Sequence, residues 1–203
     1  MTDKNLKINC YSDGEGAFME WSQNIRAKAL GPLLGVLGSC GVRAGHVTLL
    51  SLICGLLFSP FFGEASYLTA FVFLLLHVLI DGIDGPLARY LGKAGDRGSF
   101  TDTAADQIVV TTTTISLILS GHLDAAAGGF YIFFYAAVVT FAFIRNALET
   151  PYSWLFRPRF VVFGWIAIEV FFLPGTLSGV VWAAVLLLGL KSLTGFVAIR
   201  RKI

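Results

Sequence analysis

Charged residues are scarce in this chain. Only 14% of its 203 residues are Asp, Glu, Lys or Arg, whereas 56% are hydrophobic. An ordinary soluble domain carries about 25% charged residues, so the composition excludes that class of protein. The net charge of +2 says little by itself, and no nucleic-acid partner is expected.

Cysteine is also rare. Cys10, Cys40 and Cys54 show neither a metal-binding spacing nor a disulfide framework, and we expect them to be small apolar fillers. No cleavable leader is predicted either. The polar stretch 1–15 is not followed by a short apolar run with a cleavage site, so no removable signal peptide is expected.

Long apolar segments dominate the rest of the chain. A helix needs about 20 apolar residues to cross a bilayer. On this criterion six spans are predicted, over residues 47–62, 67–90, 103–120, 128–148, 160–173 and 177–199. The predicted fold is therefore an all-α integral membrane protein with six transmembrane helices.

Lys and Arg are missing from three of the predicted connections, those around residues 63–66, 121–127 and 174–176. The basic residues gather instead near both termini and in the two opposite connections. Cytoplasmic loops carry the excess of Lys and Arg in membrane proteins. We therefore expect both termini and the connection after the second span to be cytoplasmic, at the inner membrane if the source is bacterial.

The region before the first span has amphipathic character. Residues 17–38 alternate apolar side chains with polar ones, and Trp21 is suited to the headgroup level. This pattern predicts an interfacial helix; the alternative is a helix packed on the cytoplasmic face of the bundle. The predicted organisation is an N-terminal segment over 1–40 and a six-helix transmembrane domain over 41–203.

Four aspartates interrupt the apolar pattern between the second and third predicted spans. Carboxylates beside a bilayer are costly, which makes them candidates for function. They are spaced by three and by four residues, so each pair shares one face of a helix. Oxygen-only ligands suit Mg²⁺ or Mn²⁺, and two such ions can clamp a diphosphate. The residues are Asp81, Asp84, Asp102 and Asp106.

Two other interpretations of this cluster exist. The aspartates could form a proton or ion path in a transporter, or a purely structural charged cluster. Glycines at 82, 85, 95 and 98 favour the phosphate interpretation, because they remove side chains where a phosphate must approach. Arg89, near Asp84, can offer a planar fork of donors to such a group.

The segment resembles the signature of the CDP-alcohol phosphotransferases, D-x2-D-G-x2-A-R-x8-G-x3-D-x3-D, over 26 residues from Asp81 to Asp106. The resemblance implies a homodimeric membrane enzyme that transfers a phosphoalcohol group from a CDP-linked donor to an acceptor hydroxyl and releases CMP. It also implies roles for individual residues. Metal ligands are Asp81, Asp84, Asp102 and Asp106; Asp106 is also the base; CDP contacts are Gly85, Arg89, Gly98 and Thr48.

One departure concerns the entry to the first span. Members of the family often carry Pro-Asn-x-x-Thr there, whereas this chain has Ala-Gly-His-Val-Thr over 44–48, so only Thr48 matches. His77, one turn before Asp81, could line the nucleotide site, but a histidine bonded between helices is the favoured interpretation.

Basic residues after the fourth span are candidates for acceptor binding. Arg145, Arg157 and Arg159 resemble the positions that family members with phosphorylated acceptors place around that pocket. Arginine suits phosphate recognition. The alternative is that these residues are only cytoplasmic anchors of the spans.

The predicted function is phospholipid synthesis. The expected donor is CDP-diacylglycerol, and the acceptor is a small alcohol such as inositol phosphate or glycerol phosphate. Three alternatives remain open. They are a CDP-aminoalcohol phosphotransferase acting on a lipid alcohol, an intramembrane prenyltransferase, and a carboxylate-lined ion transporter.

Overall fold

The computed structural model describes residues 30–152 and 157–203, and these residues form helices and connections without a β-strand. A short helix covers Leu30–Ser39. Six longer helices follow. They are α2 (Ala44–Gly63), α3 (Tyr67–Tyr90), α4 (Asp96–Leu119), α5 (Ala125–Ala147), α6 (Arg159–Phe171) and α7 (Leu177–Lys202).

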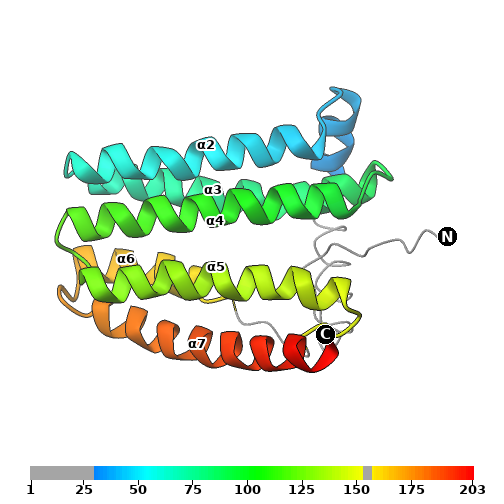
Figure 1. Cartoon of the computed structure of the whole chain (residues 1–203). Helices are drawn as coiled ribbons and strands as arrows, with labels where there is room; N and C mark the ends of the chain where they lie inside the picture. Colours follow the sequence, from blue (N-terminus) through cyan, green and yellow to red (C-terminus); the bar gives the residue numbers. More distant parts are fainter. Residues whose placement is uncertain (1–29, 153–156) are drawn as a thin grey trace.

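The six helices run side by side with alternating direction (Figure 1). Helix α2 packs against α3 and α4, and α5 packs against α7. Helix α6 packs against α7. The group formed by α2, α3 and α4 meets the group formed by α5, α6 and α7 where α4 contacts α5 and α3 contacts α6. The α3–α4 and α5–α6 connections therefore lie at the same end as the C-terminus (Figure 1).

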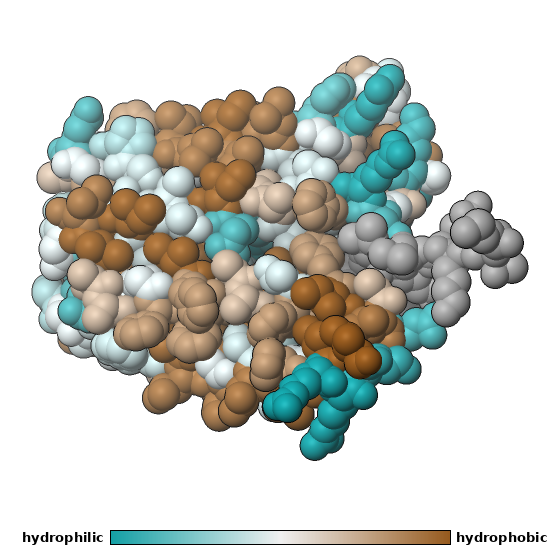
Figure 2. Space-filling view, viewed as in Figure 1, coloured by the Kyte–Doolittle hydropathy of each residue, from teal (hydrophilic) through white to brown (hydrophobic). Residues whose placement is uncertain are grey.

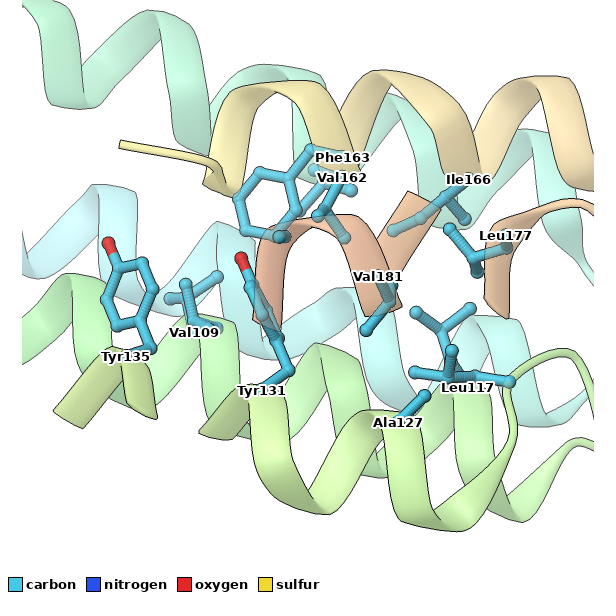
Figure 3. Close-up of a cluster of buried hydrophobic side chains, with 14 of the residues drawn as sticks. Val109, Leu117, Ala127, Tyr131, Tyr135, Val162, Phe163, Ile166, Leu177 and Val181 are labelled. Atoms are coloured by element: carbon cyan, nitrogen blue, oxygen red, sulfur yellow. The ribbon is translucent and has the colours of Figure 1, made fainter. Parts of the chain in front are cut away.

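Small residues allow some of these helices to approach closely. A Cβ atom built on Gly55 of α2 would come within 2.5 Å of the Val109 side chain on α4. Glycine at such contacts lets backbones pack tightly where no hydrophobic effect drives helices together in lipid. Val109 belongs to the main apolar core, in which Leu117, Tyr131, Ile166 and Val181 of four different helices are also buried (Figure 3).

Apolar side chains also cover much of the outside. Leu68, Leu119 and Leu186 are 73%, 82% and 67% exposed, and brown residues extend over much of the visible face (Figure 2). Hydrophilic side chains gather at the end that holds the C-terminus (Figure 2). Among the described residues, α2, α3, α5 and α7 are long and apolar enough to cross a membrane.

Each of the six predicted spans corresponds to a helix, and α3 matches its prediction at both ends. The main difference is α4, which begins at Asp96 rather than near residue 103. Asp96 lies in the first turn, where a carboxylate interacts favourably with the helix dipole. Helix α6 has 13 residues and is about 20 Å long, shorter than the hydrocarbon core of a bilayer.

The predicted N-terminal helix lies partly outside the described residues, Trp21 included. Its described part, Leu30–Ser39, packs against the bundle. Leu34 is 2% exposed and forms a small cluster with Val47 of α2 and Leu87 of α3. This contact fastens the chain at the end where α3 finishes, while the amphipathic helix as a whole stays a prediction.

Candidate functional site

The site is centred on three of the four aspartates. Asp81 comes from α3, and Asp102 and Asp106 come from α4. One carboxylate oxygen from each of these residues lies within 4.8 Å of the others. Helices α3 and α4 are antiparallel and both pack against α2, and each carries carboxylates spaced by about one turn, so these side chains come together.

Asp84 lies beside this group with a partner of its own. Its Oδ2 accepts a hydrogen bond of 2.7 Å from the Thr48 hydroxyl of α2. Asp84 and Asp102 also lie within interaction range of each other. Thr48, which the resemblance placed at the nucleotide, therefore contacts a predicted metal ligand. One carboxylate oxygen of Asp84 is fixed by this bond.

A second link between α2 and α3 lies nearby. His77 Nδ1 is 3.1 Å from the carbonyl oxygen of Ser51, and the Ser51 hydroxyl donates to the carbonyl oxygen of His77 at 3.0 Å. Both side chains are buried. This pair confirms the interpretation of His77 as a histidine bonded between helices.

Arg159 enters the site from α6. Its Nη2 lies 2.9 Å from Asp81 Oδ2, and its Nη1 forms an ion pair with Asp106. The arginine is only 3% exposed. A buried charge is tolerated when it is paired, and here one guanidinium bridges carboxylates of two helices. The three elements α3, α4 and α6 are thereby joined at a single point.

The cluster lies inside the bundle rather than at its tip. Asp81 precedes the end of α3 by nine residues, and Asp106 follows the start of α4 by ten. At the rise of an α-helix, both stand about 14 Å from the helix ends. The short helix α6 begins at Arg159, so its first residue is at the level of the carboxylates.

Three glycines of the signature border open space among the described residues. A Cβ atom on Gly82 or Gly98 would meet no atom of the described residues within 4 Å, and one on Gly85 would meet only the Arg89 guanidinium. Arg89 itself is exposed. The predicted CDP contacts at Gly85, Arg89 and Gly98 thus border accessible volume.

Arg145 is placed differently from Arg159. Its Nε donates to the carbonyl oxygen of Thr150 at 2.7 Å, and its Nη2 donates to that of Pro151 at 3.0 Å. The guanidinium also lies 4.1 Å above the ring of Tyr152. Among the described residues Arg145 forms no ion pair with the four aspartates. It holds the α5–α6 connection instead.

Tyr152 carries this connection onto α7. Its hydroxyl donates to the carbonyl oxygen of Lys191 at 3.1 Å, and Lys191 Nζ lies 5.8 Å from the ring centre. Burial raises the pKa of the Tyr152 phenol, and the neighbouring Arg145 charge opposes that shift. The phenol therefore stays protonated near neutral pH and can keep this bond.

Two residues complete the comparison with the sequence. Arg157 is exposed at the surface. Glu169 of α6 is buried, and its carboxylate accepts backbone N–H bonds from Gly175 and Leu177. Its role was not predicted, although a lone carboxylate inside an apolar segment was a signal for one.

The carboxylates fit a hard divalent cation. They offer oxygen ligands only, which suits Mg²⁺ or Mn²⁺. The Oδ1 atom of Asp102 is buried without a hydrogen-bond partner among the described residues. A buried carboxylate oxygen in that position requires a donor or a cation. Asp81, Asp102 and Asp106 would hold the ion, with Asp84 beside them.

Comparison with known proteins agrees with this chemistry. Residues 42–193 match the family model described as CDP-alcohol phosphatidyltransferase. The chain is 35% identical over 99 residues to the inner membrane protein YnjF of Escherichia coli, covering 48% of each protein. It is 29% identical over 100 residues to an archaetidylinositol phosphate synthase of Pyrococcus horikoshii, covering 48% of this chain and 53% of that one.

The chain thus spans about half the length of the curated relatives it matches. No solved structure matches it significantly. The family model, in contrast, extends from the start of α2 into α7 and includes all four aspartates and Arg159. The chain belongs to the CDP-alcohol phosphatidyltransferase family.

Proposed function

We propose that this chain transfers a phosphatidyl group from CDP-diacylglycerol to the hydroxyl of a small alcohol and releases CMP. The convergence of Asp81, Asp102 and Asp106 is the observation that carries the proposal. The family match supports it, because the matched region contains these residues. The partners are a CDP-linked lipid, an alcohol acceptor and the bilayer.

The residues divide the chemistry among themselves. Asp81, Asp84, Asp102 and Asp106 hold Mg²⁺ or Mn²⁺, which supplies positive charge against the diphosphate when it is bound. Gly85 and Gly98 leave room for CDP beside them, and the nearby Arg89 and Thr48 complete that side of the site. The open volume beside Gly82, Gly85 and Gly98 supports this assignment.

Asp106 acts as the general base. It accepts the proton of the acceptor hydroxyl, whose oxygen forms a bond to the β-phosphorus of the donor. The bond between that phosphorus and the oxygen shared with CMP breaks, and CMP departs with the electron pair. Asp106 is buried beside the other two carboxylates, which suits a base that works next to the reacting phosphate.

We further propose that the acceptor carries a phosphate, as in inositol phosphate or glycerol phosphate. Arg159 supports this, since its guanidinium already lies among the reacting carboxylates. The name of the Pyrococcus relative also includes inositol phosphate. Arg157 precedes Arg159 at the same end. Arg145 contributes indirectly, by holding the connection that leads to α6.

The arrangement in the membrane follows from the same reasoning. We propose that α4 and α6 cross the bilayer together with α2, α3, α5 and α7, as one domain over 41–203 after an N-terminal segment over 1–40. The α2–α3, α4–α5 and α6–α7 loops contain no Lys or Arg, which supports cytoplasmic termini and a cytoplasmic opening of the site. A homodimer is part of the proposal, on the resemblance to the family.

The test uses purified full-length protein with Mg²⁺ or Mn²⁺, CDP-diacylglycerol and separate acceptors, with CMP as the readout. Inositol phosphate and glycerol phosphate should release CMP, and the unphosphorylated alcohols should not. Asp106→Asn should abolish release, whereas the exposed Glu64→Gln should not change it. A second set of reactions supplies CDP-aminoalcohols and diacylglycerol. Release of CMP only in the second set, or in no reaction at all, would overturn the proposed function.

A further inference from the structure

Arg159 contacts the same carboxylates that would hold the cation. Its two terminal nitrogens reach Asp81 and Asp106, and both aspartates belong to the group whose oxygens lie within 4.8 Å of one another. A divalent ion held by this group needs oxygens from the same two residues. The arginine and the ion would therefore need the carboxylate oxygens of the same two aspartates.

Electrostatic repulsion adds to this competition for oxygen ligands. A guanidinium has donors only and is always charged, so it cannot adapt by losing a proton. A guanidinium and a divalent ion that share two carboxylates are two positive centres a few ångströms apart, and their repulsion is weakly screened in a buried site. Arg159 is 3% exposed, and the Phe160 ring lies 4.6 Å from its guanidinium carbon. Solvent therefore does little to screen the repulsion between the guanidinium and the ion.

We propose that Arg159 competes with the divalent cation for Asp81 and Asp106, and that cation binding releases the guanidinium to receive the anionic group of the acceptor. The competition itself depends only on the contacts of Arg159. The identity of the anion as an acceptor phosphate rests on the proposed function. Under this proposal the cation and the acceptor bind in a coupled manner through one side chain.

The opposite arrangement makes opposite predictions. If Arg159 instead steadied Asp81 and Asp106 from outside while they held the ion, its removal would weaken cation binding. Competition predicts that its removal strengthens binding. Coupling also works in both directions, because two ligands that affect one another must do so by the same factor. An anion that captures Arg159 should then tighten cation binding.

The first experiment measures Mn²⁺ affinity by calorimetry on the full-length protein in detergent, without substrates. Arg159→Gln should bind Mn²⁺ more tightly than the unsubstituted protein, by about tenfold, within the usual range of such couplings. Arg201→Gln, which removes an exposed positive charge at the end of α7, is the matched control and should change the affinity little. Equal or weaker binding by Arg159→Gln would overturn the proposal.

The second experiment adds inorganic phosphate as a probe of the released guanidinium. Phosphate should tighten Mn²⁺ binding in the unsubstituted protein, and the effect should be largely lost in Arg159→Gln. If both proteins respond equally, phosphate acts on the ion directly and the coupling through Arg159 is wrong. Because neither measurement requires turnover, a failure here is distinct from a failure to release CMP.

The third experiment needs no variant and so does not depend on how Arg159→Gln folds. The unsubstituted protein is treated with the arginine reagent phenylglyoxal, and modification at each arginine is quantified by mass spectrometry. Mn²⁺ should accelerate modification of Arg159 and leave exposed Arg201 unaffected. Protection of Arg159 by Mn²⁺, or an unchanged rate, would contradict the release of its guanidinium.

Discussion

The Thr48 hydroxyl donates a 2.7 Å hydrogen bond to Oδ2 of Asp84, across the contact between α2 and α3. Both side chains are 7% exposed. The first long helix, which supplies no carboxylate to the site, therefore sets the orientation of one carboxylate beside the metal-binding group. Ser51 and His77 make the neighbouring link between the same two helices.

Replacing Thr48 tests this relationship. Thr48→Val keeps the shape of the side chain but removes the donor, so it leaves a buried carboxylate oxygen without its partner. We expect a loss of about 1–3 kcal/mol in the free energy of unfolding and a higher Mn²⁺ concentration for half-maximal CMP release. Thr48→Ser retains the hydroxyl and should behave like the unsubstituted protein. If the valine and serine variants match each other, the hydroxyl does not position Asp84.

The convergence of the aspartates could be predicted from the sequence, because it depends on residues that lie close together in the chain. Spacings of three and four residues determine which side chains share a helix face, and a short connection brings Asp81 near Asp102 and Asp106. The positions of the helices could be predicted for the same reason, since the length of an apolar segment is enough to indicate a membrane-spanning helix. The start of α4 was placed too late, because a polar first turn resembles a loop in a search for apolar residues.

The contacts of Arg159 could not be predicted in this way. It lies 78 residues from Asp81 in the chain, and its partner choice depends on how α6 packs against α3. Arg145 has the same residue type and a similar place in the sequence, yet it bonds to carbonyl oxygens of its own connection. The sequence offers the same two interpretations for both arginines, and only the packing of the helices distinguishes their contacts.

Gly195 of α7 forms a notch for Tyr152. A Cβ atom at this position would overlap the Tyr152 hydroxyl oxygen and lie 3.1 Å from Phe141. Gly195→Ala should displace the tyrosine and lower the free energy of unfolding by about 1–3 kcal/mol. Thermal unfolding in detergent measures the change.

Two companion variants make this prediction specific. Gly189→Ala, on the same helix, places its Cβ at ordinary distances of 3.7–3.9 Å from Phe134 and should be tolerated. Tyr152→Phe removes the overlapping oxygen and should restore part of the stability lost in Gly195→Ala. A double variant that is no more stable than Gly195→Ala would show that Tyr152 is not the obstacle.

Glu169 is a cap for α7 at the end of the bundle away from the aspartates. Its Oε1 accepts from the Gly175 N–H at 2.6 Å and its Oε2 from the Leu177 N–H at 2.7 Å. Glu169→Gln replaces one acceptor by a donor, so one buried N–H loses its partner. We expect about 1–3 kcal/mol lower stability, whereas Glu64→Gln, at an exposed site, should have little effect.

Cation binding distinguishes this cap from Arg159. The two residues lie on the same helix, separated by ten residues or about 15 Å. Glu169→Gln should therefore leave Mn²⁺ affinity unchanged while Arg159→Gln changes it. A shift of equal size in both variants would mean that the position of α6 as a whole, rather than the guanidinium, controls the ion.

A substitution at Gly85 should affect stability and substrate binding in opposite directions. A Cβ atom there would meet only the Arg89 guanidinium, at 3.5 Å, so the fold has room for it. Alanine is also the better helix former, and Gly85→Ala in α3 should raise the free energy of unfolding by about 0.5–1 kcal/mol.

The methyl group added by Gly85→Ala would occupy the volume proposed for the CDP diphosphate. The KM for CDP-diacylglycerol should then rise about tenfold or more. Gly164→Ala in α6, whose Cβ would meet no atom of the described residues within 4 Å, should give the stability gain without the change in KM. If Gly85→Ala leaves KM unchanged, the diphosphate does not lie against this residue.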